Sequence, residues 1–323
     1  MRIAYKITAD GSNITELVQD RLLSCQITDQ AGVKSDRLTL VLDDRDQRLE
    51  IPETGAEIEV SLGYVGQAMA NMGKYVVDEV EVNGPSREMT IRANAADMTG
   101  EIKAPKERSW DAVSLGDVVR KIAGEHKLTP AISQELSSIQ LGHVDQTESD
   151  MQFVTRLAAD HGGTAKVADG RLVVATRAAA KTTLGADLPK VNIDAGDCAD
   201  WSATLAERGR YKTVIAQWHD LKTGKRSQER AGSGKPELTL KHTYQSKDAA
   251  KRAADTRLKS VNRSGSKISI GSMVGEPTIS AEMQVVLTGF RTGIDGDGWI
   301  INGVTHSFTS SGYTCSLEIE QKD

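Results

Sequence analysis

The chain has 323 residues, of which 38% are hydrophobic and only 4% aromatic, and its 40 Lys and Arg against 45 Asp and Glu leave a formal net charge of −5. The length predicts two or three domains, and the acidic balance argues against a general binder of polyanions, which would carry a basic surplus. No apolar run approaches the ~18 residues of a membrane span, and the N-terminus lacks the apolar core of a signal peptide. We therefore expect neither membrane insertion nor sequence-specific nucleic-acid binding.

The first hundred residues predict β-strands. Apolar side chains alternate with polar ones in residues 36–44 and 56–64, a period of two that is typical of strands with one buried face. Further strands are predicted at residues 74–82 and 87–95. Several short strands in succession indicate a barrel or a sandwich.

A helix is predicted next, because apolar side chains recur at helical spacing between residues 115 and 123. Ser114 and Asp117 can form a capping box at its start, and Pro130 follows its end.

A second helix begins at the N-cap Ser149 and buries Phe153 and Leu157. One of the glycines at 162–163 supplies the left-handed residue that ends it, and residues 164–176 then predict a hairpin.

The chain is expected to be loop-like over residues 177–205 and to form a strand from residue 211 to a turn near 223. Basic residues between Lys222 and Lys235 predict a charged loop, which is either solvated or a patch facing another subunit or a nucleic acid. Residues 246–261 predict a third helix, and residues 312–321 a closing strand.

Two β regions resemble each other. Residues 59–64 followed by 75–82 match residues 285–290 followed by 299–306 in their glycine, aromatic and aliphatic positions. Chance similarity between two hairpins is one explanation, since such patterns are common. The other is a duplicated barrel, which predicts that strands 57–64 and 75–82 superpose on strands 283–290 and 299–306.

No pattern of catalytic or metal-ligating residues is complete. The pair Asp160–His161 lacks the strained nucleophile turn of a hydrolase triad, so His161 is expected to end a helix. Residues 293–299 resemble half a calcium loop and residues 231–237 resemble a phosphate loop, but both lack required positions. We therefore predict no catalytic residue, no metal site and no cofactor.

Five segments carry a resemblance to a known family: residues 36–64, 72–85, 108–123, 143–163 and 277–320. They are similar to the phage late control gene D family, the tail baseplate hubs of contractile-tailed phages and phage-like bacteriocins, and more distantly to the hub part of VgrG spike proteins. The residues that match the family's motifs are expected to be structural. They are Trp110, Leu115, Gly116, Asp117, Glu148, Ser149, Asp150, Phe153, Arg156, Leu157, Gly162, Gly312 and Tyr313.

The resemblance implies an α+β, mainly β fold with two related tail-tube-like β-barrel domains and an α/β middle domain. The expected boundaries are 1–100 for the first barrel, 101–205 for the middle domain and 206–323 for the second barrel with one helix. It also implies a homotrimer, in which two barrels per subunit form a pseudo-sixfold ring that joins the tail tube to the central spike. The family has no catalytic residues in this part, so none is carried over.

The implied partners are the tail tube protein and a spike that is a separate polypeptide, since the chain stops at Asp323. The tape measure protein and other baseplate proteins are further candidates. The implied location is the tail baseplate of a virion or bacteriocin particle, with assembly in the host cytoplasm; the choice between phage and bacteriocin stays open. Two other functions also stay open, a β-rich peptidoglycan hydrolase and a carbohydrate-binding tail component.

Overall fold

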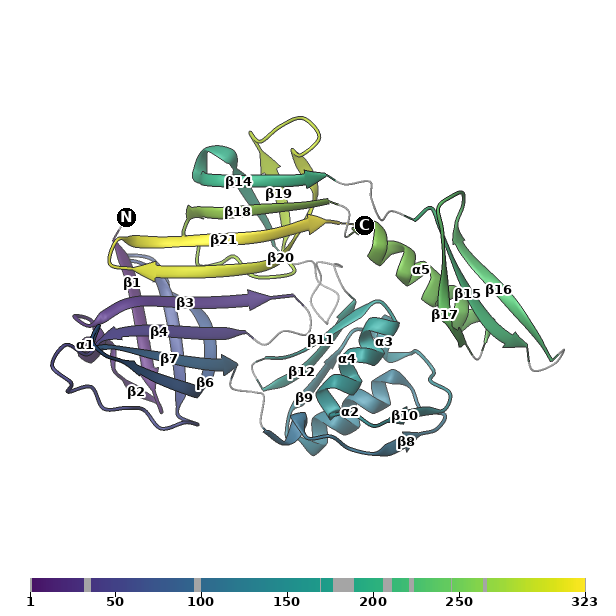
Figure 1. The fold of residues 1–323 in the computed structure, drawn as a ribbon, viewed down its shortest axis with the longest axis horizontal. Coiled ribbons are helices and arrows are strands. Elements are labelled where there is room, and N and C mark those ends of the chain that lie inside the picture. Colours follow the sequence, from purple (N-terminus) through teal and green to yellow (C-terminus); the bar gives the residue numbers. More distant parts are fainter. Residues whose placement is uncertain are drawn as a thin grey trace.

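The computed structural model describes residues 2–31, 36–95, 100–168, 170–176, 189–205, 211–220, 224–244, 246–263 and 266–322. The fold is mainly β, as predicted, and most strands belong to one large sheet (Figure 1). A middle α/β segment lies below that sheet in Figure 1, and an appendage of three strands and a helix lies to its right.

The N-terminal unit is the part of the large sheet formed by residues 3–95. Its elements are β1 (Ile3–Ala9), β2 (Ser12–Asn13), α1 (Thr15–Val18), β3 (Leu22–Gln30), β4 (Arg37–Asp43), β5 (Glu57–Tyr64), β6 (Ala70–Asn83) and β7 (Glu88–Ala95). Leu38, Leu40 and Leu42 of β4 are buried and alternate with less buried neighbours, so the predicted period of two is confirmed here.

The C-terminal unit is the rest of the large sheet. Its elements are β13 (Lys190–Asp194), the short 3-10 helix η2 (Ala195–Asp197), β14 (Cys198–Leu205), β18 (Ser266–Val274), β19 (Gln284–Thr288), β20 (Gly296–Thr309) and β21 (Gly312–Gln321). The prediction of a loop over residues 177–205 is therefore wrong for β13 and β14. The alternation in both strands is short, covering residues 190–194 and 201–205, and their strand partners, β19 and β18, lie far along the chain.

The two units have the same strand order. When the two-residue β2 is left out, the N-terminal unit runs β1-β5-β6-β7-β4-β3 and the C-terminal unit runs β13-β19-β20-β21-β18-β14, which is first-fourth-fifth-sixth-third-second along the chain in each case. Neighbouring strands are antiparallel in both units, except that β13 lies parallel to β19 whereas β1 lies antiparallel to β5. The C-terminal unit carries the appendage between its second and third strands.

The long fifth strand of each unit carries a β-bulge at a matching place. The ladder between β6 and β7 shifts at Asp78, and the ladder between β20 and β21 shifts at Asn302. These are the two small polar residues that occupy matching positions in the sequence repeat.

The predicted superposition of the hairpins is wrong by one residue. Tyr75 pairs with Ile58 and Trp299 pairs with Val285, whereas the sequence match places Gln284 opposite Trp299. The two hairpins have connections of different length, and the connection fixes the register of a hairpin.

The units join edge to edge, because β20 of the C-terminal unit pairs antiparallel with β3 of the N-terminal unit from Gly303↔Gln30 to Thr309↔Ser24. One hydrophobic core runs through both units. Among the described residues the sheet does not close into a barrel, and β14 ends it on one side.

The middle segment has its own hydrophobic core. Its elements are η1 (Gly100–Lys103), β8 (Arg108–Trp110), α2 (Leu115–Glu125), β9 (Thr129–Ile132), α3 (Gln134–Ser137), β10 (Val144–Gln146), α4 (Asp150–Asp160), β11 (Gly163–Ala168) and β12 (Arg171–Thr176). The predicted helices α2 and α4 and the predicted hairpin β11–β12 are confirmed.

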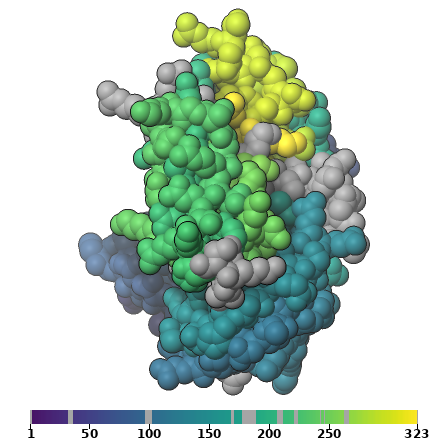
Figure 2. Space-filling view, turned by 90° about the vertical axis from the view of Figure 1, so that its right-hand side faces the viewer, coloured from purple at the N-terminus to yellow at the C-terminus, as the bar shows by residue number. Residues whose placement is uncertain are grey.

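The appendage consists of β15 (Thr213–Asp220), β16 (Lys225–Gly232), β17 (Glu237–Tyr244) and α5 (Lys247–Arg263). Its helix packs on one face of its sheet through a small core of mainly alanines. Figure 2 shows it in green beside the middle segment, where Gly162 lies against Thr256 of α5. The predicted basic loop is wrong in part: β16 is a strand paired to β15, and Lys222 lies outside the described residues.

Candidate functional site

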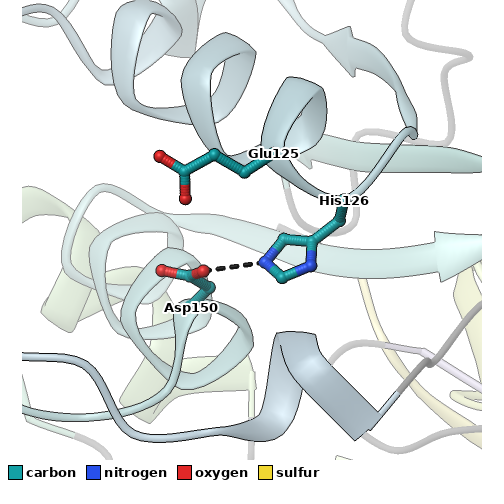
Figure 3. A group of neighbouring side chains, drawn as sticks. All are labelled: Glu125, His126 and Asp150. Atoms are coloured by element: carbon teal, nitrogen blue, oxygen red, sulfur yellow. Dashed lines mark hydrogen bonds and ion pairs between the residues drawn. The ribbon is translucent and has the colours of Figure 1, made fainter.

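The carboxylate of Asp150 is fully buried at the start of α4 and is the centre of a polar cluster (Figure 3). The cap places it there, since the Ser149 side chain accepts a hydrogen bond from the backbone N–H of Gln152 and starts the helix. The unpaired N–H groups of a helix N-terminus favour a negative charge.

Four side chains donate to this carboxylate. Lys106 and Arg108 form ion pairs with it, and His126 Nε2 and Gln146 Nε2 each lie 2.8 Å from one of its oxygens. Burial alone would raise the pKa of Asp150. The hydrogen bonds from Lys106, Gln146 and His126 and the charge of Arg108 outweigh burial and lower that pKa to about 2.

Glu125, His126 and Asp150 bring potential metal-ligand atoms within 4.8 Å of one another (Figure 3). However, Lys106 and Arg108 also pair with Glu125, at 3.1 and 2.8 Å. A metal cation would have to compete with these two fixed positive charges for both carboxylates. The donor set therefore favours a buried ion-pair network over a metal centre.

The aromatic motif residues pack beside this network. Trp110 and Phe153 stack with their ring centroids 5.8 Å apart, and the guanidinium of Arg108 lies 4.6 Å from the Trp110 ring. On the other side Arg156 lies over Phe153 and bonds Glu148 at 2.7 Å. These contacts tie α4 to β8 and the preceding loop.

The motif at the start of α2 is a packing and capping motif. Ser114 and Asp117 form the predicted capping box, and Leu115 is fully buried. A Cβ at Gly116 would lie 2.3 Å from Ser137 Oγ, so α2 can approach α3 only with glycine at this position.

The pair Asp160–His161 lies at the end of α4. His161 is the C-cap residue, with its N–H bonded to the carbonyl of Ala158 at 3.1 Å, and Gly162 follows with a φ of +76°. Burial, and then the nearby charge of Arg252, lowers the pKa of His161. The helix-terminating position predicted for His161 is confirmed.

We expect Leu157→Ala to destabilise the chain by ~2–5 kcal/mol, because Leu157 is 3% exposed in the core of the middle segment and its loss leaves a cavity. His161→Ala, at the end of the same helix, should cost ~1 kcal/mol or less. Urea unfolding of the two variants measures both values. Equal losses would contradict the assignment of His161 to helix termination.

Gly312 and Tyr313 lie far along the chain, at the turn into β21 and on it. The Tyr313 hydroxyl lies 2.7 Å from Nδ1 of the buried His306, whose Nε2 lies 3.1 Å from the carbonyl of Ile279. Burial raises the pKa of Tyr313. The structure therefore places the predicted motif residues in two locations, and only the middle segment gathers many of them together.

One cluster was missed by the sequence analysis. Lys166 of β11 pairs with Asp29 at 2.8 Å and with Asp36 at 2.7 Å, and Asp29 also accepts from the backbone N–H of Ala281 at 2.9 Å. Burial, and then the charge of Asp29, raises the pKa of Asp36 to about 6. The cluster joins the two units of the sheet to the middle segment.

The exposed apolar side chains on the outer strands were also missed. Val82 of β6 is 52% exposed, and Trp201 and Leu205 of β14 are 37% and 57% exposed. No helix in the described part of the chain is long and apolar enough to cross a membrane.

Residues 35–312 match the profile of a family described as phage tail baseplate hub (GPD). The chain is 32% identical over 361 residues to a protein of Escherichia phage 186 that carries the name "Probable baseplate hub protein", and the match covers 99% of this chain and 93% of the relative.

Two solved structures are similar in fold. A tail protein from Neisseria meningitidis MC58 matches with a TM-score of 0.72 and 15% identity, over 99% of this chain and 97% of that one. A chain of the Francisella PdpA-VgrG complex matches with a TM-score of 0.60 and 9% identity, over 100% of this chain and 58% of that one.

Proposed function

The chain belongs to the phage tail baseplate hub family and is a structural component of the baseplate, and we propose that it acts there as a symmetry adapter without chemistry of its own. In this proposal three copies form a ring that joins the sixfold tail tube to a separate central spike. The likeness to a chain of the PdpA-VgrG complex supports a spike partner.

The observation that carries the proposal is the repeated strand order of the two units. A trimer has three copies of any surface, whereas a sixfold tube end presents six equivalent ones. Two units of one topology in each chain give six similar surfaces around one axis. Duplication inside the chain thus lets three copies of the chain match the six equivalent surfaces of the tube end.

The strand order also supports revised boundaries. We assign residues 3–95 to the first unit, residues 100–176 to the middle segment, and residues 190–205 with 266–321 to the second unit. Residues 211–263 are then an insertion in the second unit. The sheet stays open over the residues that the structure describes, so the predicted barrels would be completed only when neighbouring copies pair their edges.

The proposed partners beyond the spike are the tail tube protein, the tape measure protein and other baseplate proteins, with assembly in the host cytoplasm. The ring should be open at its centre, and each interface should bury well over ~1,000 Å² if the trimer is stable. The buried ion-pair network around Asp150 and the motif residues beside it are proposed to be structural.

Light scattering of the purified chain, alone and with its spike, tests the proposal. A mass about three times the chain's 34.8 kDa is expected. A chain that stays monomeric with its spike would contradict it, as would peptidoglycan cleavage that is abolished by Asp160→Asn or His161→Ala.

A further inference from the structure

The contact between the two units within one chain is a strand pair with a defined register. His306 of β20 lies opposite Ile27 of β3, and Phe308 lies opposite Cys25. His306, Ile27 and Cys25 are all buried in this contact. The polar face of the same ladder pairs Thr305 with Thr28.

Each strand of this contact has a counterpart in the other unit. β20 is the fifth strand of its unit, and its counterpart is β6; β3 is the second strand of its unit, and its counterpart is β14. The matching bulges align Asp78 with Asn302. Val82 therefore takes the place of His306.

The ladders beside β3 and β14 give the second alignment. Cys25 pairs with Leu40 of β4, and Trp201 pairs with Ile270 of β18, the counterpart of β4. Leu40 and Ile270 occupy matching positions, because Leu40 pairs with Ile91, the partner of Val80, and Ile270 pairs with Leu317, the partner of Val304. Trp201 thus takes the place of Cys25, and Ala203 takes the place of Ile27.

Neither counterpart strand has a partner on its outer edge among the described residues. β14 pairs with β18 alone, and residues 79–83 of β6 pair with β7 alone. Their apolar side chains are exposed accordingly: Val82 and Leu205 occupy core-side positions and are 52% and 57% exposed, and Trp201, which contacts Phe290 edge-on at 5.1 Å, is still 37% exposed. Exposed strand edges of this kind are sites for pairing with another chain.

We propose that β14 of one copy pairs antiparallel with residues 80–84 of the next copy, the end of β6 and the glycine after it, in the register of the contact within the chain. Val82 then lies opposite Ala203 of the second copy, Val80 opposite Leu205, and Gly84 opposite Trp201. Apolar side chains then meet on the core-side face of the sheet, and Gly84 leaves room for the indole ring of Trp201.

On the other face Glu81 lies opposite Thr204 and Asn83 opposite Ser202, so polar side chains meet polar ones. The two edges do not pair with each other in the described part of one chain, where the strands β18, β21, β20, β3, β4 and β7 lie between them in the sheet. A head-to-tail contact between different edges generates a ring when the rotation closes. This inference rests on the proposed trimer and specifies which edges form it.

Disulfide trapping tests the register. The test protein carries Val82→Cys and Ala203→Cys in a Cys198→Ser background, since Cys198 is the partly exposed native thiol whereas Cys25 and Cys315 are buried. Opposed residues of an antiparallel pair have Cα atoms about 4.5–5.5 Å apart, within the range of a disulfide. Oxidation with copper phenanthroline should give covalent trimers on a non-reducing gel, reversed by dithiothreitol.

Val82→Cys alone and the pair Glu81→Cys with Ala203→Cys are the matched controls, because position 81 faces the other side of the sheet. Crosslinking of the 81–203 pair in place of the 82–203 pair would overturn the register. Light scattering before oxidation, with the spike present, separates the two proposals: a trimer that neither pair crosslinks overturns the edge contact alone, whereas a chain that stays monomeric with its spike overturns the trimer itself.

Discussion

Asp150→Asn should destabilise the middle segment by about 1–3 kcal/mol, since the partly exposed cations of Lys106 and Arg108 would lose a fully buried carboxylate and would be left with Glu125 as their ion-pair partner. Equilibrium urea unfolding at pH 7 measures the loss. Asp111→Asn is the matched control, because Asp111 forms only an exposed pair with His143 and should contribute less than ~1 kcal/mol.

The carboxylate of Asp150 should also make the free energy of unfolding depend on pH, and the sign of this dependence follows from its pKa. The pKa of Asp150 is lowered to about 2 in the folded chain and is ~3.9 in an unfolded chain. Its stabilisation is therefore complete above about pH 4 and is lost as the pH falls towards 2. The free energy of unfolding should fall more steeply over this range in the wild type than in Asp150→Asn. If the free energies of unfolding of the two proteins fall in parallel as the pH decreases, the network does not stabilise the ionised carboxylate of Asp150.

Val82→Lys should weaken association of the trimer by about 100-fold or more while leaving the single chain folded. The side chain is half exposed in one copy, so the lysine costs little there. In the proposed contact the same lysine would be buried opposite an alanine without a carboxylate, and an unpaired buried charge costs several kcal/mol. Sedimentation over a range of concentrations measures the shift.

Val65→Lys is the control for this variant, since Val65 is 61% exposed and lies in the turn after β5, away from residues 79–83. It should associate like the wild type. If Val82→Lys also associates like the wild type, residues 80–84 at the end of β6 are not in the interface.

The elements that could be predicted from the sequence are those whose signals are local. The capping box of Ser114 and Asp117, the Ser149 cap and the glycine that ends α4 each depend on residues within one or two turns of helix. The alternation in β4 and β5 is local in the same way, because one face of each strand is buried. The positions of Asp150, Phe153 and Arg156 also follow from the predicted helix α4, whereas Trp110 lies on β8, which was not predicted.

The features that could not be predicted depend on partners far along the chain. The apolar and polar residues of β14 alternate only from Trp201 to Leu205, and what makes this segment a strand is its pairing with β18, which lies beyond the appendage in the chain. Lys166 meets Asp29 across 137 residues, and no spacing rule connects them. The repeat itself could be found from the sequence, but its register could not, since the turn lengths of the two hairpins shift the pairing by one residue.

End-on views of the assembled particle in electron micrographs test the central claim most directly, because they report the rotational symmetry of the ring. Two similar units in each of three copies predict a ring with an open centre, in which a strong threefold signal is accompanied by six similar densities close to the axis. A ring with only three such densities, or a particle without a ring, would contradict the assignment of the two units to six equivalent positions.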